Sequence, residues 1–131
     1  GILAMRPEVL VLDEPTAGLD PQGRDEILGL IKEYHKQSGA TVLIVSHSME
    51  DIAGLADRLL VMNHAKVLFC DTPRAVFSHA NEIIAAGLDI PMITKVMLEL
   101  KKRGHDVDTS GYTVQQALDA LRACKKKGGA R

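Results

Sequence analysis

Residues 9–12 are four consecutive apolar residues, Val-Leu-Val-Leu, and they lead directly into Asp13 and Glu14. An apolar run of this kind predicts a strand buried on both faces, as in a parallel sheet that helices cover. Because an unpaired charge is costly inside a core, both carboxylates should lie at the carboxyl end of the strand, where open α/β sheets bind ligands. A buried strand that merely ends in solvated acids would look the same at this point of the chain.

The residues after this strand predict a turn and then a helix. Pro15 disfavours helical geometry at the preceding residue, Glu14, so an extended backbone is expected there. Gly18 permits a tight turn, and Asp20 followed by Pro21 is typical of a helix start, with a capping side chain and a proline at the first helical position. Glu14 should therefore be held at the tip of the strand.

A second apolar run places an imidazole at the end of a neighbouring strand. Residues 41–45 predict this strand, His47 follows it closely, and a helix over 21–37 joins the two runs. Ser48 and Asp51 have the spacing of a helix-capping pair, so a short helix should begin near Ser48.

The rest of the chain predicts a hairpin and several helices. The expected elements are strands 58–62 and 66–70, a helix over 73–77, an irregular or helical link over 78–87, a helix beginning at 89–91 and a last helix capped by Thr113. In the hairpin turn, Asn63 would supply any left-handed residue. An apolar stripe at helical spacing is formed by Ile93, Val96, Met97 and Leu100.

Composition excludes several classes of protein. No apolar run approaches the ~18 residues that a membrane-spanning helix needs. The basic clusters at 101–103 and 125–127 fall at the ends of predicted helices, where cations interact favourably with the helix dipole, so no nucleic-acid partner is expected. The two cysteines are too few and too far apart for a metal knuckle or a disulfide framework. A first residue that is Gly1 rather than methionine, with a central strand almost at once, predicts a truncation.

Two motifs carry a resemblance to a known family. Residues 12–20, Leu-Asp-Glu-Pro-Thr-Ala-Gly-Leu-Asp, resemble the Walker B motif and D-loop of ABC-type ATPases, and residues 45–47, Val-Ser-His, resemble their H-loop. Residues 14–24, 46–51 and 56–58 are similar to the ATPase subunits of energy-coupling factor transporters, which power the uptake of vitamins and of cobalt or nickel ions. The resemblance covers essentially the whole chain, but only the carboxyl-terminal half of such a subunit.

The resemblance implies a fold and a role for four residues. The fold is α/β: a partial P-loop NTPase (ABC ATPase) sheet with flanking helices, a β-hairpin and a helical carboxyl-terminal extension. With ATP and Mg²⁺ as cofactors, Asp13 would bind the metal and Glu14 would polarise the attacking water as general base. His47 would hydrogen-bond the γ-phosphate. Asp20 would reach across an ATPase dimer toward the partner's phosphate loop, and it is also a candidate helix cap.

The resemblance also implies domains, partners and a location. Residues 1–78 would form the carboxyl-terminal part of the ATPase core, and residues 79–131 a helical extension linked to dimerisation. The implied partners are a second ATPase subunit, a membrane-embedded scaffold subunit and a substrate-binding membrane subunit, at the cytoplasmic face of the cell membrane. The transported substrate, and the choice between a homodimer and a heterodimer, do not follow from the sequence.

Two motifs of a complete ATPase subunit are missing from residues 1–131. There is no Gly-x-x-x-x-Gly-Lys-Ser/Thr loop to cradle phosphates and no Leu-Ser-Gly-Gly-Gln-type signature. Without backbone amides and a lysine on the phosphates, two carboxylates would repel a polyanion, so the chain alone is predicted to be inactive and to bind ATP poorly. Two alternatives stay open: an ABC-type ATPase that is not tied to transport, and a non-catalytic remnant that only dimerises through its helical end.

Overall fold

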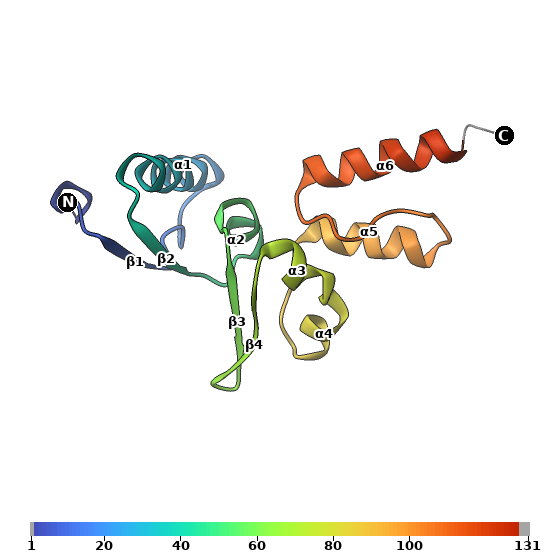
Figure 1. The fold of residues 1–131 in the computed structure, drawn as a ribbon, viewed down its shortest axis with the longest axis horizontal. Coiled ribbons are helices and arrows are strands. Elements are labelled where there is room, and N and C mark those ends of the chain that lie inside the picture. The colour runs from blue at the N-terminus through green and yellow to red at the C-terminus, as the bar shows by residue number, and fades with distance from the viewer. Residues whose placement is uncertain (1, 129–131) are drawn as a thin grey trace. The chain divides into compact units, whose positions relative to one another are not determined.

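The computed structural model describes residues 2–128 of the chain. Its internal contacts divide the chain into two compact units, Gly1–Leu55 and Ala56–Arg131. The first unit contains η1 (Ile2–Met5), β1 (Val9–Asp13), α1 (Pro21–Ser38), β2 (Thr41–Val45) and α2 (Met49–Leu55). The second contains β3 (Leu59–Asn63), β4 (Lys66–Asp71), α3 (Pro73–Ser78), α4 (Ala80–Ala85), α5 (Met92–Lys102) and α6 (Val114–Gly128) (Figure 1). The functional boundary predicted after residue 78 stays a prediction.

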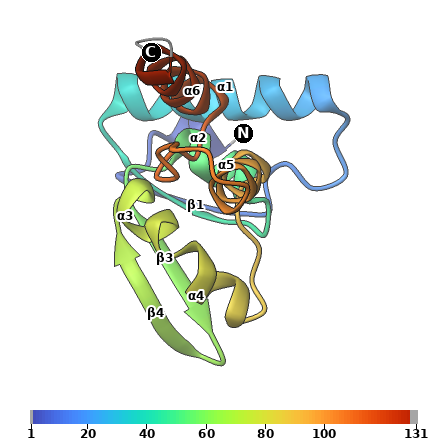
Figure 2. The ribbon, with the colours of Figure 1, turned by 90° about the vertical axis from the view of Figure 1, so that its right-hand side faces the viewer.

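In the first unit, β1 and β2 form a parallel pair. The strands are in register over their whole length and end with Asp13 opposite Val45. Parallel neighbours need a crossover connection, and α1 supplies it along one face of the pair (Figure 2). Leu10 of β1 and Ile31 of α1 are both buried. The predicted order of strand, helix and strand is therefore confirmed.

Local sequence signals determine both ends of α1. The Asp20 side chain accepts a hydrogen bond from the backbone N–H of Gly23 at 3.0 Å, and Pro21 occupies the first helical position. At the other end, Gly39 has the left-handed φ of +66° and its N–H donates to the carbonyl of His35. The predicted helix over residues 21–37 is confirmed, and the structure extends it by one residue.

The prediction that this first strand is buried on both faces is wrong. Apolar side chains on the face away from α1 are more than half exposed, and they are Val9, Val11, Leu43 and Val45. Side chains alternate between the two faces of a strand, so the residues between these point toward the helix. Within residues 2–55, the one long helix, α1, covers one face of the pair, and the apolar side chains of the opposite face are exposed.

In the second unit, β3 and β4 form the predicted antiparallel hairpin. Val61 pairs with Phe69 and Met62 with Val67, so the strand β4 carries an extra residue between these pairs, a β-bulge. The positive φ angles in the turn belong to His64 (+45°) and Ala65 (+58°). The prediction that Asn63 would adopt the left-handed conformation is therefore wrong, because Asn63 pairs with Lys66 as the last residue of β3 and leaves a two-residue loop.

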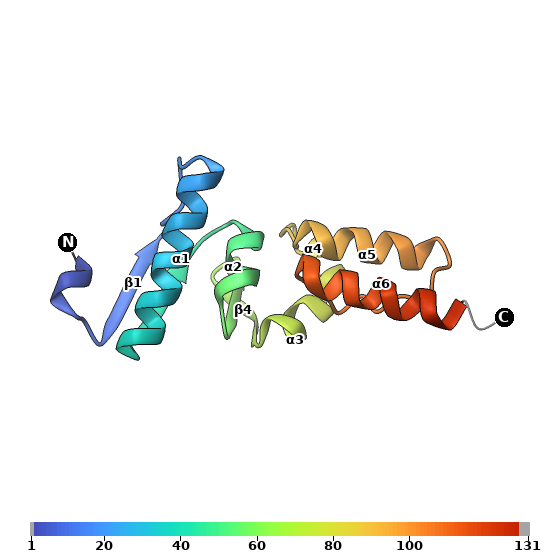
Figure 3. The ribbon, with the colours of Figure 1, turned by 90° about the horizontal axis from the view of Figure 1, so that it is seen from above.

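The helices of the second unit enclose an apolar core. Figures 1 and 3 show α5 and α6 side by side and running in the same direction, joined by the returning segment 103–113. Met97 of α5 is fully buried against Val107 and Ala117, and Ile93 and Leu100 of the predicted stripe pack on this cluster. The further side chains of this unit that are almost completely buried include Val76, Phe77, Ile83 and Ile90.

None of the helices within residues 2–128 has both the length and the apolar character that crossing a membrane requires.

Candidate functional site

The polar residues at the ends of β1 and β2 lie at the same edge of the sheet. Asp13 is the last residue of β1 and pairs with Val45, the last residue of β2. One further backbone hydrogen bond, from the Glu14 N–H to the Val45 carbonyl at 2.8 Å, keeps the chains together beyond the strands. This geometry brings Glu14 next to His47, although 33 residues separate them in the sequence.

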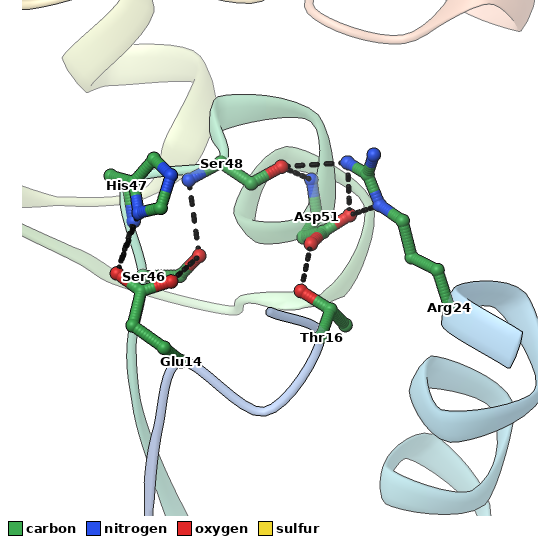
Figure 4. Close-up of polar contacts among 7 residues, drawn as sticks. All are labelled: Glu14, Thr16, Arg24, Ser46, His47, Ser48 and Asp51. Atoms are coloured by element: carbon green, nitrogen blue, oxygen red, sulfur yellow. Dashed lines mark hydrogen bonds and ion pairs between the residues drawn. The ribbon is translucent and has the colours of Figure 1, made fainter. Parts of the chain in front are cut away.

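Glu14 and His47 are in direct contact, as Figure 4 shows. Glu14 Oε1 lies 2.8 Å from His47 Nδ1 and accepts the His47 backbone N–H at 3.0 Å. The hydroxyl of Ser46 donates to the other carboxylate oxygen, Oε2, at 3.4 Å. The hydrogen bond from the His47 side chain is the largest of the effects that lower the pKa of Glu14 below its ordinary value. The site therefore holds Glu14 as a carboxylate.

The backbone of Glu14 is not extended, so that prediction from Pro15 is wrong. Its φ is +46°, in the left-handed region that residues other than glycine seldom adopt. Two hydrogen bonds stabilise this conformation: the Glu14 N–H donates to Val45, and the Glu14 carbonyl accepts from the Ala17 N–H at 3.1 Å. The chain reverses immediately after the strand, and this reversal turns the Glu14 side chain toward His47.

Asp13 and Asp20 occupy separate positions. Asp13 is exposed at the end of β1, while the Asp20 carboxylate accepts the Gly23 N–H as the cap of α1. The structure thus brings together Glu14 and His47 of the four predicted site residues, and it holds Asp20 in its capping role.

Sequence reasoning missed a polar cluster beside this site. The side chain of Asp51, in the first turn of α2, is 6% exposed. Its Oδ2 accepts the Thr16 hydroxyl at 2.7 Å, and its Oδ1 accepts Arg24 Nε at 2.5 Å. Arg24 Nη2 also donates to the Ser48 hydroxyl at 2.6 Å (Figure 4). The predicted capping contact is present but long, because the Asp51 backbone N–H lies 3.5 Å from the Ser48 hydroxyl oxygen. The Asp51 carboxylate does not take part in it and binds Thr16 and Arg24 instead.

Asp13 is the residue of this edge that best fits a magnesium ion. Mg²⁺ typically takes one or two carboxylates and completes its shell with waters and phosphate oxygens. Asp13 ends β1 in an exposed position, so a single carboxylate is available there. Among residues 2–128, no group of three or more His, Cys, Asp or Glu side chains could hold a metal ion.

Comparisons with known proteins give consistent matches. A family model described as "AAA domain, putative AbiEii toxin, Type IV TA system" matches residues 1–51. The energy-coupling factor transporter ATP-binding protein EcfA2 of Clostridioides difficile (strain 630) is 51% identical over 122 residues, which cover 92% of this chain and 42% of that protein. EcfA1 of Clostridium perfringens (strain 13 / Type A) is 43% identical over 121 residues, which cover 92% of this chain and 43% of that protein.

A solved structure gives the same result. The structure of cbiO1 from Clostridium perfringens, part of the ABC transporter complex cbiONQ, is similar with a TM-score of 0.56 and 38% sequence identity. The match covers 79% of this chain and 38% of that one. The chain therefore spans about two fifths of the length of the relatives it matches. The predicted resemblance and the predicted partial ABC ATPase fold are confirmed.

Proposed function

We propose that this chain, which is similar over 92% of its length to ATP-binding proteins of energy-coupling factor transporters, is part of an ATP-hydrolysing subunit. The complete subunit would energise an ABC importer for metal ions or vitamins. The observation that carries the proposal is the contact between Glu14 and His47 at the carboxyl edge of the β1–β2 pair. A carboxylate beside an imidazole at this edge is suited to orienting a water molecule against a phosphate.

In this proposal Glu14 is the general base and Asp13 the magnesium ligand. Asp13 would hold Mg²⁺, which would supply positive charge to offset that of the phosphate oxygens. Glu14 is suited to its role by its position, because its carboxylate lies at the sheet edge against the His47 ring and the Ser46 hydroxyl and can accept a proton from a water molecule there. Its Oε1 takes two hydrogen bonds from His47, while Oε2 takes the weaker, longer bond from Ser46. Oε2 is therefore the oxygen that can turn to a water molecule at lower cost.

The contact with Glu14 indicates which nitrogen of His47 is the donor. An ionised carboxylate has no proton to give, so Nδ1 must donate to Glu14. In the neutral ring the second nitrogen, Nε2, is then an acceptor and cannot donate to an anionic phosphate oxygen. For His47 to hydrogen-bond the γ-phosphate while it holds Glu14, both ring nitrogens must carry protons.

The partners and location are proposed from the relatives. The cbiO1 relative is part of a transporter complex, and we propose that this chain works with a second ATPase subunit, a membrane-embedded scaffold subunit and a substrate-binding membrane subunit. It would lie at the cytoplasmic face of the membrane. Asp20 would face the second ATPase subunit, and residues 79–131 would contribute to the dimer. If the chain belongs instead to an ATPase that is not tied to transport, a scaffold subunit should not stimulate its ATP hydrolysis. If it is a non-catalytic remnant, it should not hydrolyse ATP at all.

The test replaces Glu14 with glutamine in the complete subunit. Glutamine keeps the size of the side chain but is not a base, so ATP turnover should fall by about a hundredfold or more while ATP binding is retained. Glu33→Gln is the matched control, because Glu33 is an exposed acid of α1 that hydrogen-bonds Gln37 at 2.9 Å. Unimpaired turnover in Glu14→Gln excludes this residue as the base. Calorimetry on the isolated chain should show no tight binding of magnesium-ATP.

A further inference from the structure

We propose that Asp51 is a positioning residue for this site, an inference that rests on the proposed function. Its buried carboxylate joins the loop that carries Glu14 to the segment that carries His47. Asp51 itself does not contact the substrate. It controls the distance and the orientation between Glu14 and His47, the two residues that would act on the water and the phosphate.

The first connection runs through Thr16. The Thr16 hydroxyl donates to Asp51 Oδ2 at 2.7 Å, and both side chains are buried. Thr16 lies two residues after Glu14, inside the turn that the Glu14 carbonyl closes by accepting the Ala17 N–H. Glu14 begins this turn with a left-handed backbone, so the turn that contains Thr16 also sets the direction in which the Glu14 side chain leaves the strand.

The second connection runs through Arg24 and two serines. Arg24 binds Asp51 Oδ1 and donates from Nη2 to the Ser48 hydroxyl at 2.6 Å. The Ser48 N–H donates to the Ser46 hydroxyl at 3.0 Å, and that hydroxyl donates to Glu14 Oε2. These hydrogen bonds link the Glu14 carboxylate to Thr16 by way of Asp51, and the backbone from Thr16 back to Glu14 closes the ring, with His47 between the two serines in the chain (Figure 4).

The burial of Asp51 shows why a helix cap alone does not account for it. A carboxylate that is 6% exposed loses its hydration, so it is tolerated only where its oxygens are paired and bonded. Here one oxygen receives an arginine from α1 and the other a hydroxyl from the loop after β1. These are two different segments of the first unit, which makes Asp51 the junction between them. Reacting groups must be held to within a fraction of an ångström for efficient catalysis.

The decisive variant is Thr16→Val, tested in the complete subunit. Valine has nearly the shape of threonine but cannot donate to Asp51, whereas Thr16→Ser keeps the hydroxyl. We expect Thr16→Val to lower kcat by about tenfold or more and to leave KM for ATP within about twofold. The kcat of Thr16→Ser should stay within about threefold of the parent value. The kcat of Asp51→Asn should lie between those of Thr16→Val and Thr16→Ser. Glu33→Gln, an exposed acid in the same unit, is the control.

A spectroscopic measurement on the 131-residue chain separates positioning from general stability. The His47 backbone N–H donates to Glu14, so its amide proton resonance reports that contact. Thr16→Val should move this resonance by more than Glu33→Gln does, at a temperature where melting curves show each protein fully folded. An unmoved His47 resonance overturns the proposal, as does equal loss of kcat in Thr16→Val and Thr16→Ser.

The two proposals fail in different ways. If Glu14→Gln abolishes turnover but Thr16→Val keeps the parent kcat, the positioning role of Asp51 is refuted and the proposed function stands. If Glu14→Gln keeps full turnover, the proposed function is refuted, and the His47 amide resonance still decides whether Asp51 holds the two segments together. Should Asp51→Asn fail to fold, the two Thr16 variants carry the test.

Discussion

Replacing Arg24 with methionine should destabilise the first unit by about 2–4 kcal/mol. Removing one member of a buried ion pair costs about 3–5 kcal/mol, because the other charge is left without its partner. Asp51 is 6% exposed and meets this condition, but the Arg24 side chain is 37% exposed, so water reaches the pair and reduces the cost. The bond from Arg24 to Ser48 adds about 1 kcal/mol to the loss. Methionine retains most of the aliphatic stem, so packing changes little.

The same change should cost far less once the charge on Asp51 has been removed. In an Asp51→Asn background no buried anion is stranded, so Arg24→Met should cost about 1 kcal/mol. The assay is urea unfolding followed by tyrosine fluorescence. The chain has two tyrosines and no tryptophan, so a Tyr112→Phe background leaves Tyr34 of α1 as the reporter of the first unit. Equal costs of Arg24→Met in the two backgrounds would refute the reasoning, since they would mean that the two charges are not coupled.

Met97→Ala should destabilise the second unit by about 2–5 kcal/mol, because it leaves a cavity where a fully buried side chain stood. Val114→Ala, at a position that is 64% exposed, should cost under about 0.5 kcal/mol, and urea unfolding followed by circular dichroism measures both. His47→Ala should raise the pKa of Glu14 toward its ordinary value, and carbon-13 NMR titration should detect the change. Because the pKa of Glu14 is lowered in the folded chain, its contact with His47 stabilises fully above the ordinary carboxyl pKa and is lost as pH falls through the lowered value, so the stability difference between parent and variant should disappear in acid. Ala65→Gly should stabilise the hairpin by about 0.5–1 kcal/mol, since glycine adopts the φ of +58° without strain; an unchanged melting temperature would contradict this.

The elements that sequence predicted well are those with local signals. Asp20 and Gly39 mark the two ends of α1 because the chemistry of a cap depends on a few neighbouring residues. The hairpin turn shows the limit of such reasoning. Of residues 63–65, asparagine is the type that best tolerates the left-handed region. Asn63 nevertheless pairs with Lys66, so the positive φ angles belong to His64 and Ala65. Register across the strands outweighed the preference of one residue.

The candidate site was predictable in part for the same reason. Parallel strands end at one edge, so Glu14 and His47 could be expected to meet from the two apolar runs alone. The partners of Asp51 could not be predicted, because they lie 35 and 27 residues away and depend on how α1 and α2 are oriented on the sheet. The conformation of Glu14 was missed because the rule for residues before proline does not include the hydrogen bonds that reverse the chain after β1.

The exposed apolar face of the β1–β2 pair should determine how strongly this chain associates with itself in solution. Val9, Val11, Leu43 and Val45 present a row of branched aliphatic groups to solvent, next to strand edges that can accept another strand. Self-association should therefore grow with protein concentration, and ammonium sulfate should accelerate it, because excluded salts strengthen apolar burial. In dilute solution without such salts, the chain should remain dispersed.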